Sequence, residues 1–237
     1  MKIIKLTNKL LQHFKAQIVR YPSIDVARRI KIINYYKINT IIDVGANVGN
    51  YAIELYSLGY KNKIISFEPL IQEFTELKNN TKKYKNWTCY NYALGDSNEN
   101  SIINVAGNKD SSSILKMLDT HVDNAPNSKY IGKQEIQIKS LDSIKDSLFN
   151  ETDNVFLKID TQGFEMNVLK GAIKSLKFIK CIQIELSIVQ LYEGSSDYRL
   201  IIDFLLNKGF SLISIENGFS NPTTGELLQF DGIFSRK

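Results

Sequence analysis

The sequence predicts an α/β fold built on a seven-stranded, mostly parallel sheet whose last strand runs antiparallel. Three observations lead to this prediction. Apolar, strand-like segments alternate with segments of helical periodicity along most of the chain, which is the pattern of a parallel sheet. A turn containing two glycines joins the first of these strands to a helix. The final two strand-like segments follow each other without a helix between them, and such neighbours pair antiparallel.

Two helices are expected before the first strand. Apolar residues recur at helical spacing over residues 3–20, and Tyr21-Pro22 ends this segment because the residue before a proline disfavours helix. Ser23 or Asp25 can cap a second helix over residues 24–37. We expect these helices to cover a sheet edge or the mouth of a cofactor site, or to form a homodimer contact. The predicted domains are an N-terminal helical extension, residues 1–38, and one α/β domain, residues 39–237.

The other elements follow from the same periodicities. Core strands are expected at residues 40–43, 63–68, 154–160, 180–185, 210–215 and 227–234, and residues 87–94 are expected to form the third strand and its exit. Shorter strands are expected at 100–105 and 134–138. Helices are expected from residue 51 onwards and at 70–82, 140–148, 164–176 and 197–208. Residues 106–133 are irregular, and a loop this long in a compact domain indicates a functional or mobile segment. His121 in this loop is expected to be exposed to solvent.

Composition excludes several classes of function. The chain has 237 residues, is 43% hydrophobic, and has no apolar run near the ~20 residues that a membrane span needs. Its basic N-terminus lacks the unbroken apolar segment of a signal peptide, so we expect a cytoplasmic protein. The net charge of +5 comes from dispersed lysines, so no nucleic-acid partner is expected. Two histidines exclude a histidine-rich metal site, and Cys89 and Cys181 are expected to be buried free thiols.

Residues 40–50 carry the clearest local motif. Their sequence, TIIDVGANVGN, places an acid and two glycines between a strand and a helix. Gly45 and Gly49 allow the backbone to turn tightly and to approach a ligand, and open α/β sheets bind nucleotide-like ligands at this position. A dinucleotide site normally reads G-x-G-x-x-G, but Asn47 and Asn50 stand at two of those glycine positions. An acid beside the turn suits a ligand that carries an amine and no pyrophosphate.

Four of the expected strands end in carboxylates, namely Asp43, Glu68, Asp160 and Glu185. The carboxyl ends of parallel strands line one edge of a sheet, and ligands bind in the crevice there. Four acids after apolar strands are hard to explain by surface solubility, so they indicate a site for cationic or hydroxyl-rich groups. Glu68 in particular is placed to accept hydrogen bonds from both hydroxyls of a ribose.

The motifs in combination resemble the FkbM-type family of class I S-adenosylmethionine (SAM)-dependent methyltransferases. The resemblance rests on DVGANVG at 43–49, FEP at 67–69, ALGD at 93–96, SSS at 111–113, LKIDTQGFE at 157–165, VLKGA at 168–172 and IQIE at 182–185. It spans roughly residues 40–235 and departs from the family at Gln162, where Glu is more common. It implies a Rossmann-like fold, SAM as the cofactor, and O-methylation of a hydroxyl of a sugar, glycan or related natural product. The acceptor partner is then a small molecule or a glycan.

Residue roles follow from this resemblance and from the strand ends. The residues expected to bind the cofactor are Asp43, Gly45, Asn47, Gly49, Asn50, Glu68, Pro69, Ala93, Leu94, Ser112 and Asp160. The residues expected at the reacting centre are Asp160, Glu185 and Glu165, because an alcohol is a weak nucleophile and a carboxylate within hydrogen-bond reach can remove its proton. Residues 106–133 are expected to close over the bound cofactor and acceptor, with Ser112 or Ser113 facing the site.

Each role has an alternative. Asp43 can cap the backbone of the turn, Glu165 can favour the helix dipole, and Glu185 can pair with Lys158. Asp160 can bind the amine of the cofactor, act as the base, or hold a metal. The favoured reading has no metal, although oxygen ligands from Asp160, Glu165 and Glu185 would suit Mg²⁺.

Two alternative functions stay open for the whole chain. A nicotinamide-dependent oxidoreductase of Rossmann type has the same general fold, but the missing G-x-G-x-x-G counts against it. A non-catalytic protein with a SAM-binding fold is the second alternative, and the intact row of strand-end acids argues against a decayed site.

Overall fold

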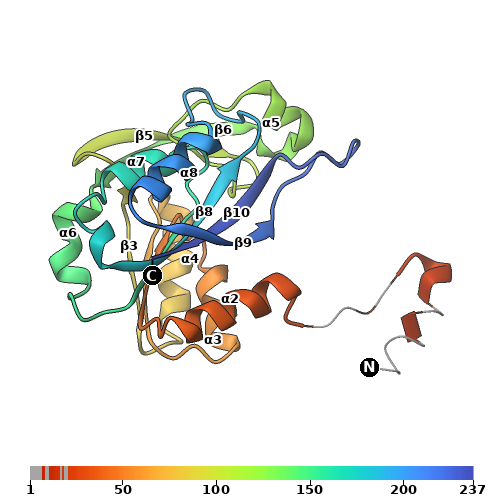
Figure 1. Ribbon diagram of the computed structural model, residues 1–237. Helices are drawn as coiled ribbons and strands as arrows, with labels where there is room; N and C mark the ends of the chain where they lie inside the picture. The colour runs from red at the N-terminus through yellow and green to blue at the C-terminus, as the bar shows by residue number, and fades with distance from the viewer. Residues whose placement is uncertain (1–6, 9–10, 17, 19–20, 237) are drawn as a thin grey trace.

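The computed structural model describes residues 7–8, 11–16, 18 and 21–236. In this part of the chain seven strands form a central sheet in the order β3-β2-β1-β7-β8-β10-β9. Figure 1 shows β8, β10 and β9 side by side in this sheet. The strands are β1 Thr40–Val44, β2 Lys63–Phe67, β3 Trp87–Tyr90, β7 Val155–Ile159, β8 Ile179–Ser187, β9 Ser211–Asn217 and β10 Gln229–Ser235. Only the contacts of β10 with β8 and β9 are antiparallel within this described sheet. The predicted sheet is therefore confirmed.

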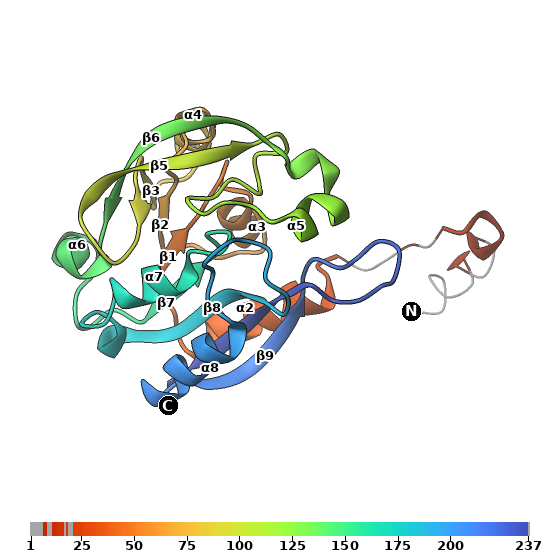
Figure 2. The same cartoon turned by 90° about the horizontal axis from the view of Figure 1, so that it is seen from above.

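Helices pack on both faces of this sheet (Figure 2). One core combines α2 (Ile24–Tyr35), α3 (Asn50–Ser57) and α4 (Ile71–Thr81) with the sheet, through side chains such as Ile33, Leu55 and Leu77. The other core combines α6 (Leu141–Leu148), α7 (Glu165–Lys170) and α8 (Tyr198–Asn207) with the opposite face. The alternation of strands and amphipathic helices thus buries both faces of the parallel strands.

A second, three-stranded sheet changes one prediction. It has the order β4-β6-β5, formed by β4 (Ala93–Leu94), β5 (Glu99–Ala106) and β6 (Tyr130–Lys139). The strand and its exit expected over residues 87–94 are divided between the two sheets, because the chain leaves the main sheet after Tyr90 and the next two-residue strand pairs with β6. The strand expected from residue 134 begins four residues earlier, since β5 supplies backbone partners along its length.

The long segment between β5 and β6 is more ordered than the sequence indicates. It contains the helix α5 (Asp119–Asn124), the 3₁₀ helix η2 (Pro126–Ser128) and an antiparallel bridge between Asn104 and Ser113.

The helix expected over residues 164–176 is shorter than predicted. α7 ends at Lys170, and the 3₁₀ helix η3 covers Leu176–Phe178. Gly171 stands where a side chain could not fit, since a Cβ there would lie 1.8 Å from the carbonyl oxygen of Gly95.

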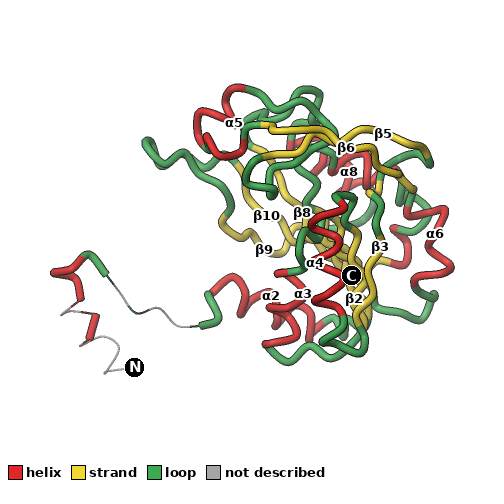
Figure 3. Tube along the Cα trace, turned by 180° about the vertical axis from the view of Figure 1, so that it is seen from behind, coloured by secondary structure: helices red, strands yellow, loops and turns green. Residues whose placement is uncertain are grey.

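The N-terminal region meets the sheet through α2, which confirms the second expected helix. Figure 3 shows α2 beside α3, and its buried Arg29 pairs with Glu216 of β9 at 2.5 Å. The helix expected over residues 3–20 lies largely outside the described residues. Within those that are described, the 3₁₀ helix η1 (Gln12–Phe14) ends at Lys15, whose φ of 52° is left-handed, so a helix continuing through Lys15 is wrong. No helix in the described part of the chain is long and apolar enough to span a membrane.

Candidate active site

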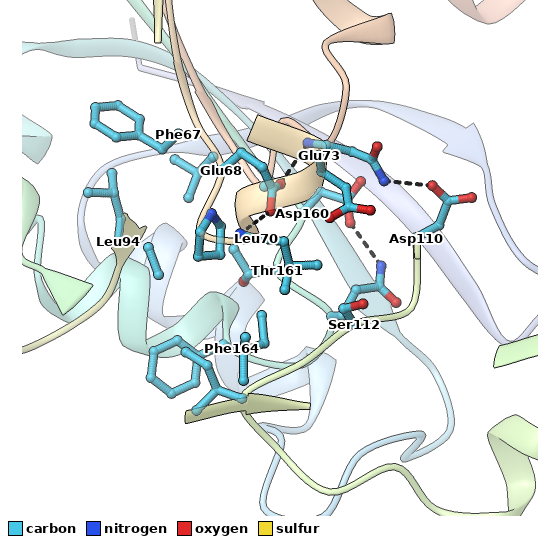
Figure 4. Close-up of a pocket in the computed structure, with 18 of the residues that line it drawn as sticks. Phe67, Glu68, Leu70, Glu73, Leu94, Asp110, Ser112, Asp160, Thr161 and Phe164 are labelled. Atoms are coloured by element: carbon cyan, nitrogen blue, oxygen red, sulfur yellow. Dashed lines mark hydrogen bonds between the residues drawn. The ribbon is translucent and has the colours of Figure 1, made fainter. Parts of the chain in front are cut away.

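A cavity of about 340 Å³ lies at the carboxyl ends of β1, β2 and β7. Its walls come from the turn after β1, the start of α4, β4, the loop after β5 and the turn after β7. Figure 4 shows Phe67 and Leu94 on one side, Asp110 on the other, and Asp160 between them. The cavity therefore has an apolar end and an acidic end. Of the residues predicted to act here, nine line it, namely Gly45, Asn47, Glu68, Pro69, Ala93, Leu94, Ser112, Asp160 and Glu185.

The turn after β1 requires glycine at one position for a steric reason. Gly45 has φ of +74°, and a Cβ on it would lie 1.8 Å from the carbonyl oxygen of Asp160. The turns after β1 and β7 therefore approach each other so closely that no side chain fits between them. The N–H groups of Gly45 and Ala46 both donate to the carbonyl of Phe67, which fixes this turn against β2.

Glu68 connects the turn after β1 to the start of α4. Its Oε2 accepts the N–H of Asn47 at 2.8 Å, and its Oε1 accepts the N–H of Leu70 at 2.9 Å. Burial raises the pKa of Glu68 to about 7, although these two donors act in the opposite direction. Each carboxylate oxygen has a second acceptor site, so a rigidly held Glu68 can still accept hydroxyl groups of a ligand.

Gln162 joins the two carboxylates at the acidic end. Its Nε2 donates to Asp160 Oδ1 at 2.9 Å and to Glu185 Oε2 at 3.0 Å. Its Oε1 accepts the hydroxyl of Tyr192 at 2.8 Å, which fixes the orientation of the amide. The sequence analysis identified Gln162 only as a departure from the family. The presence of an amide where the family more often has a carboxylate was the feature that could have marked it as a site residue.

Glu185 lies inside β8 rather than at its end, because the strand continues to Ser187. Its Oε2 also accepts the amide of Gln229 at 2.8 Å. Burial raises the pKa of Glu185 well above its ordinary value, and the negative charges of Asp160 and Glu165 add to the rise. The alternative pairing of Glu185 with Lys158 is wrong, since the lysine ammonium lies against Asp43 and Asp160.

Three predicted cofactor contacts do not reach the cavity. Asp43 lies within β1 and its side chain is fully buried, with Oδ2 accepting the hydroxyl of Ser66 at 3.1 Å. Gly49 serves packing, because a Cβ there would lie 2.5 Å from the ring of Trp87. Asn50 begins α3 with an exposed side chain. The common cause is that β1 and the turn after it place only Val44, Gly45 and Asn47 toward the cavity.

Glu165 also does not line the cavity, although it was predicted to support the reacting centre. Its Oε1 accepts the N–H groups of Thr161 and Gly163, each at 3.0 Å, and the hydroxyl of Thr161 at 3.1 Å. These bonds hold the turn that carries Gln162, whose φ of 56° is left-handed. Glu165 is therefore a buried support of this turn. In the described chain no group of three or more His, Cys, Asp or Glu residues is arranged to hold a metal ion.

The loop after β5 is attached across the cavity by two contacts. Asn47 Nδ2 donates to Asp110 Oδ1 at 2.8 Å, and Lys109 Nζ lies 3.1 Å from Glu73 Oε1. Of the two serines predicted to face the site, Ser112 lines the cavity. Ser113 is buried, and its hydroxyl donates to the carbonyl of Gln162.

The prediction for His121 is wrong. It is 3% exposed, and its ring packs edge-on against Tyr192 with centroids 5.2 Å apart. Burial lowers the pKa of His121.

The strand order and the position of the cavity define a class I methyltransferase fold. The family model for the FkbM methyltransferase domain matches residues 43–212, and the chain belongs to this family. Family membership implies SAM as the cofactor and favours methyl transfer over the oxidoreductase alternative.

Solved structures are similar to this chain at low sequence identity. The FkbM methyltransferase from Methylobacillus flagellatus KT matches with a TM-score of 0.50 and 15% identity over 82% of this chain and 43% of that one. This chain thus spans less than half of that protein. A putative RNA methyltransferase from Pyrococcus horikoshii has a TM-score of 0.45 and 14% identity, over 92% of this chain and 87% of that one. An rRNA methylase from Streptococcus thermophilus has a TM-score of 0.48 and 9% identity, over 93% of this chain and 99% of that one. No curated protein matches the chain.

The residues around the cavity fit SAM in their chemistry. The apolar end, with Phe67, Leu94 and Phe164, suits an adenine ring, and the carboxyl oxygens of Glu68 can accept hydrogen bonds from ribose hydroxyls. The acidic end suits the sulfonium and the amine, which are both cationic.

Proposed function

We propose that this protein is a SAM-dependent O-methyltransferase that acts on a hydroxyl of a sugar, glycan or related natural product. The observation that carries this proposal is the pair of acids, Asp160 and Glu185, which an oriented amide joins at one end of the cavity. A hydroxyl acceptor needs a group that takes its proton, and a hydroxyl-rich acceptor needs further polar partners. Gln162 and Gln229 supply such partners beside Glu185.

The two acids are suited to different roles. SAM supplies a methyl group that its sulfonium activates. The side chain of Asp160 is 38% exposed and lines the cavity, so its carboxylate can take the proton of the acceptor hydroxyl. Burial and the negative charges of Asp160 and Glu165 raise the pKa of Glu185 and so favour its protonated form, and in that form it can donate a hydrogen bond to a neighbouring acceptor oxygen. Such a division of roles between two acids in different environments is a recurring device of enzymes.

Holding the acceptor in line with the methyl group is the other requirement of the reaction. Asp160 is fixed by Gln162 on one side and by the last residue of β1 on the other, where its backbone N–H donates to the carbonyl of Val44. Glu165 stabilises the turn that carries the amide. The reacting end of the cavity is thus built on strand ends and a capped turn, which are rigid supports for a site.

Binding and turnover measurements test this proposal. Calorimetry with SAM and with NAD on the same sample should give binding of SAM alone. Methyl-labelled SAM is then incubated with nucleotide sugars, with glycans and with RNA, and transfer of label is expected in one of the first two arms. Label in RNA would replace the acceptor class, and binding of NAD without SAM would contradict the proposal as a whole.

The replacement Glu68→Ala is expected to weaken SAM binding by tenfold or more. Glu68 is mostly ionised above its pKa of about 7, and the affinity is therefore measured above that pH. Hydrogen bonds to a charged group are worth roughly 1.5–3 kcal/mol, and the ribose hydroxyls would lose this acceptor. Calorimetry measures the affinity, and Glu76→Ala on the exposed face of α4 is the matched control. Unchanged affinity in a folded Glu68→Ala protein would remove Glu68 from the cofactor site.

The loop after β5 is expected to gain protection from hydrogen exchange when ligand binds. Its attachment through Asp110 and Lys109 closes one side of the cavity, and a ligand filling that cavity adds contacts with Ser112. Exchange is measured with and without S-adenosylhomocysteine, and residues 107–114 should slow while β9 stays unchanged. Equal exchange of residues 107–114 in both states would show that this loop is not a lid.

A further inference from the structure

A row of polar side chains crosses the centre of the buried sheet. Ser66 on β2, Asp43 on β1, Lys158 on β7 and Gln183 on β8 are neighbours in register across four adjacent strands. Each of these residues is buried, and the most exposed of them, Lys158, is only 8% exposed. The other positions of β1 and β7 are mostly aliphatic. A charged pair in the middle of such a sheet therefore calls for a physical explanation.

Lys158 contacts three oxygens that belong to three parts of the site. Its Nζ lies 3.3 Å from Asp43 Oδ1, lies 3.5 Å from Asp160 Oδ2 and donates to the carbonyl of Gly45 at 3.2 Å. Asp43 is itself held by the hydroxyl of Ser66, which accepts the indole N–H of Trp87 at 3.0 Å. One ammonium thus connects a fixed interior acid, the turn after β1 and the carboxylate that faces the cavity.

Stability alone does not account for this arrangement. Desolvating two charges costs about as much as their attraction returns, so apolar side chains of similar volume would hold the sheet at least as well. Burial acts to lower the pKa of Lys158, but the negative charges of Asp43 and Asp160 outweigh it and the pKa lies above its ordinary value. The lysine is therefore a permanent cation beneath the acidic end of the cavity.

Asp160 otherwise has acidic surroundings. The titratable groups that interact with it come from every neighbouring element, and they are Lys158 on β7, Asp110 in the loop after β5, Glu165 on α7, Glu185 on β8, Tyr192 and Asp231 on β10. Lys158 is the cation among them. The acids disfavour a second negative charge nearby, whereas a cation at 3.5 Å favours it.

We propose that Lys158 is a positioning residue that keeps Asp160 ionised and directed into the cavity, with Asp43 as the anchor that holds Lys158 in place. The inference rests on the proposed function for the role of Asp160 as proton acceptor. It gives Asp43 a function that does not require contact with the cofactor. It also explains why an acid precedes the glycine turn although its side chain never reaches the cavity.

The test uses a paired replacement, because Lys158→Met alone leaves Asp43 as a buried, unpaired charge and risks unfolding. The double variant Asp43→Asn with Lys158→Met removes both charges, and the asparagine oxygen can still accept the hydroxyl of Ser66. Urea unfolding of both variants should show that the double variant regains stability over the single one. Lys116→Met, which breaks an exposed pair with Glu193, is the matched control.

The readout is an NMR pH titration of protein labelled with ¹³C at the aspartate carboxyl groups. The signal of Asp160 is assigned by its loss in Asp160→Asn. Its titration midpoint should rise in the double variant, because the cation 3.5 Å from Asp160 is lost and a nearby cation favours the ionised carboxylate. The control should leave the midpoint in place. A folded double variant with the wild-type midpoint would overturn the inference.

SAM calorimetry on the same samples separates this inference from the proposed function. A shifted midpoint together with SAM binding in the wild type supports both. SAM binding by the wild type without any shift overturns the role of Lys158 and leaves the cofactor assignment intact. A shift in a protein that binds no SAM supports the role of Lys158 in the charge of Asp160 and contradicts the proposed function.

Discussion

The replacement Asp160→Asn is expected to lower turnover by ~10² or more while the protein stays folded, because a positioned general base contributes about that factor. Asparagine keeps the shape of the side chain and can still accept the amide of Gln162 through its oxygen. It cannot take a proton from an acceptor hydroxyl, and it loses the charge that pairs with Lys158. Initial rates are measured with labelled SAM and the acceptor that the screen identifies.

The same measurement separates the possible roles of Asp160. If this carboxylate only binds the amine of the cofactor, the loss appears in SAM affinity and saturating SAM restores turnover. If it takes the proton, saturating SAM leaves the loss in place. Asp203→Asn on the exposed side of α8 is the matched control and should keep the wild-type rate. Wild-type turnover and wild-type SAM affinity in Asp160→Asn would show that this edge of the sheet has been assigned wrongly.

Local sequence patterns were sufficient to place Glu68 and Asp160. Each acid directly follows a short strand, β2 or β7, so the end of the apolar sequence coincides with the end of the backbone hydrogen bonding between strands. The same reasoning put Asp43 and Glu185 at the ends of their strands, but β1 continues one residue and β8 two residues beyond the acid. Asp43 is therefore kept out of the cavity, whereas Glu185 lines it from inside β8. Where a strand ends depends on the backbone partners that its neighbours offer, and a pattern in one strand contains no information about those partners.

The parts of the site that depend on distant segments could not be predicted. The orientation of Gln162 is set by Tyr192, which lies in a different loop. The pairing of Lys158 with Asp43 follows from the register of β1 against β7, two strands that are far apart in the sequence. His121 looked like an ordinary polar loop residue, but α5 packs its ring against Tyr192 and Phe219. In each case tertiary packing determines the partners of the side chain, and the periodicity within one segment contains no information about those partners.

The replacement Gly45→Ala is expected to lower the free energy of unfolding by about 2–5 kcal/mol and to abolish measurable SAM binding. A left-handed backbone costs a non-glycine residue roughly 1–2 kcal/mol, and forcing extra atoms into a packed region typically adds about 1–3 kcal/mol. The φ of Gly45 is +74°, and the new Cβ would lie 1.8 Å from the backbone oxygen of Asp160. Because this oxygen belongs to the backbone, relief requires the turns after β1 and β7 to separate, and that displaces Asp160 from the cavity.

Gly225→Ala is the matched control for this prediction. Gly225 has nearly the same φ, +77°, but no atom lies within 4 Å of the position of its Cβ. It should therefore lose only the roughly 1–2 kcal/mol of left-handed strain and keep wild-type SAM affinity. Urea unfolding and calorimetry on both variants measure the two effects. Equal destabilisation by the two alanines, with SAM binding retained in Gly45→Ala, would mean that the two turns can move apart freely and that their close approach does not hold the cofactor site together.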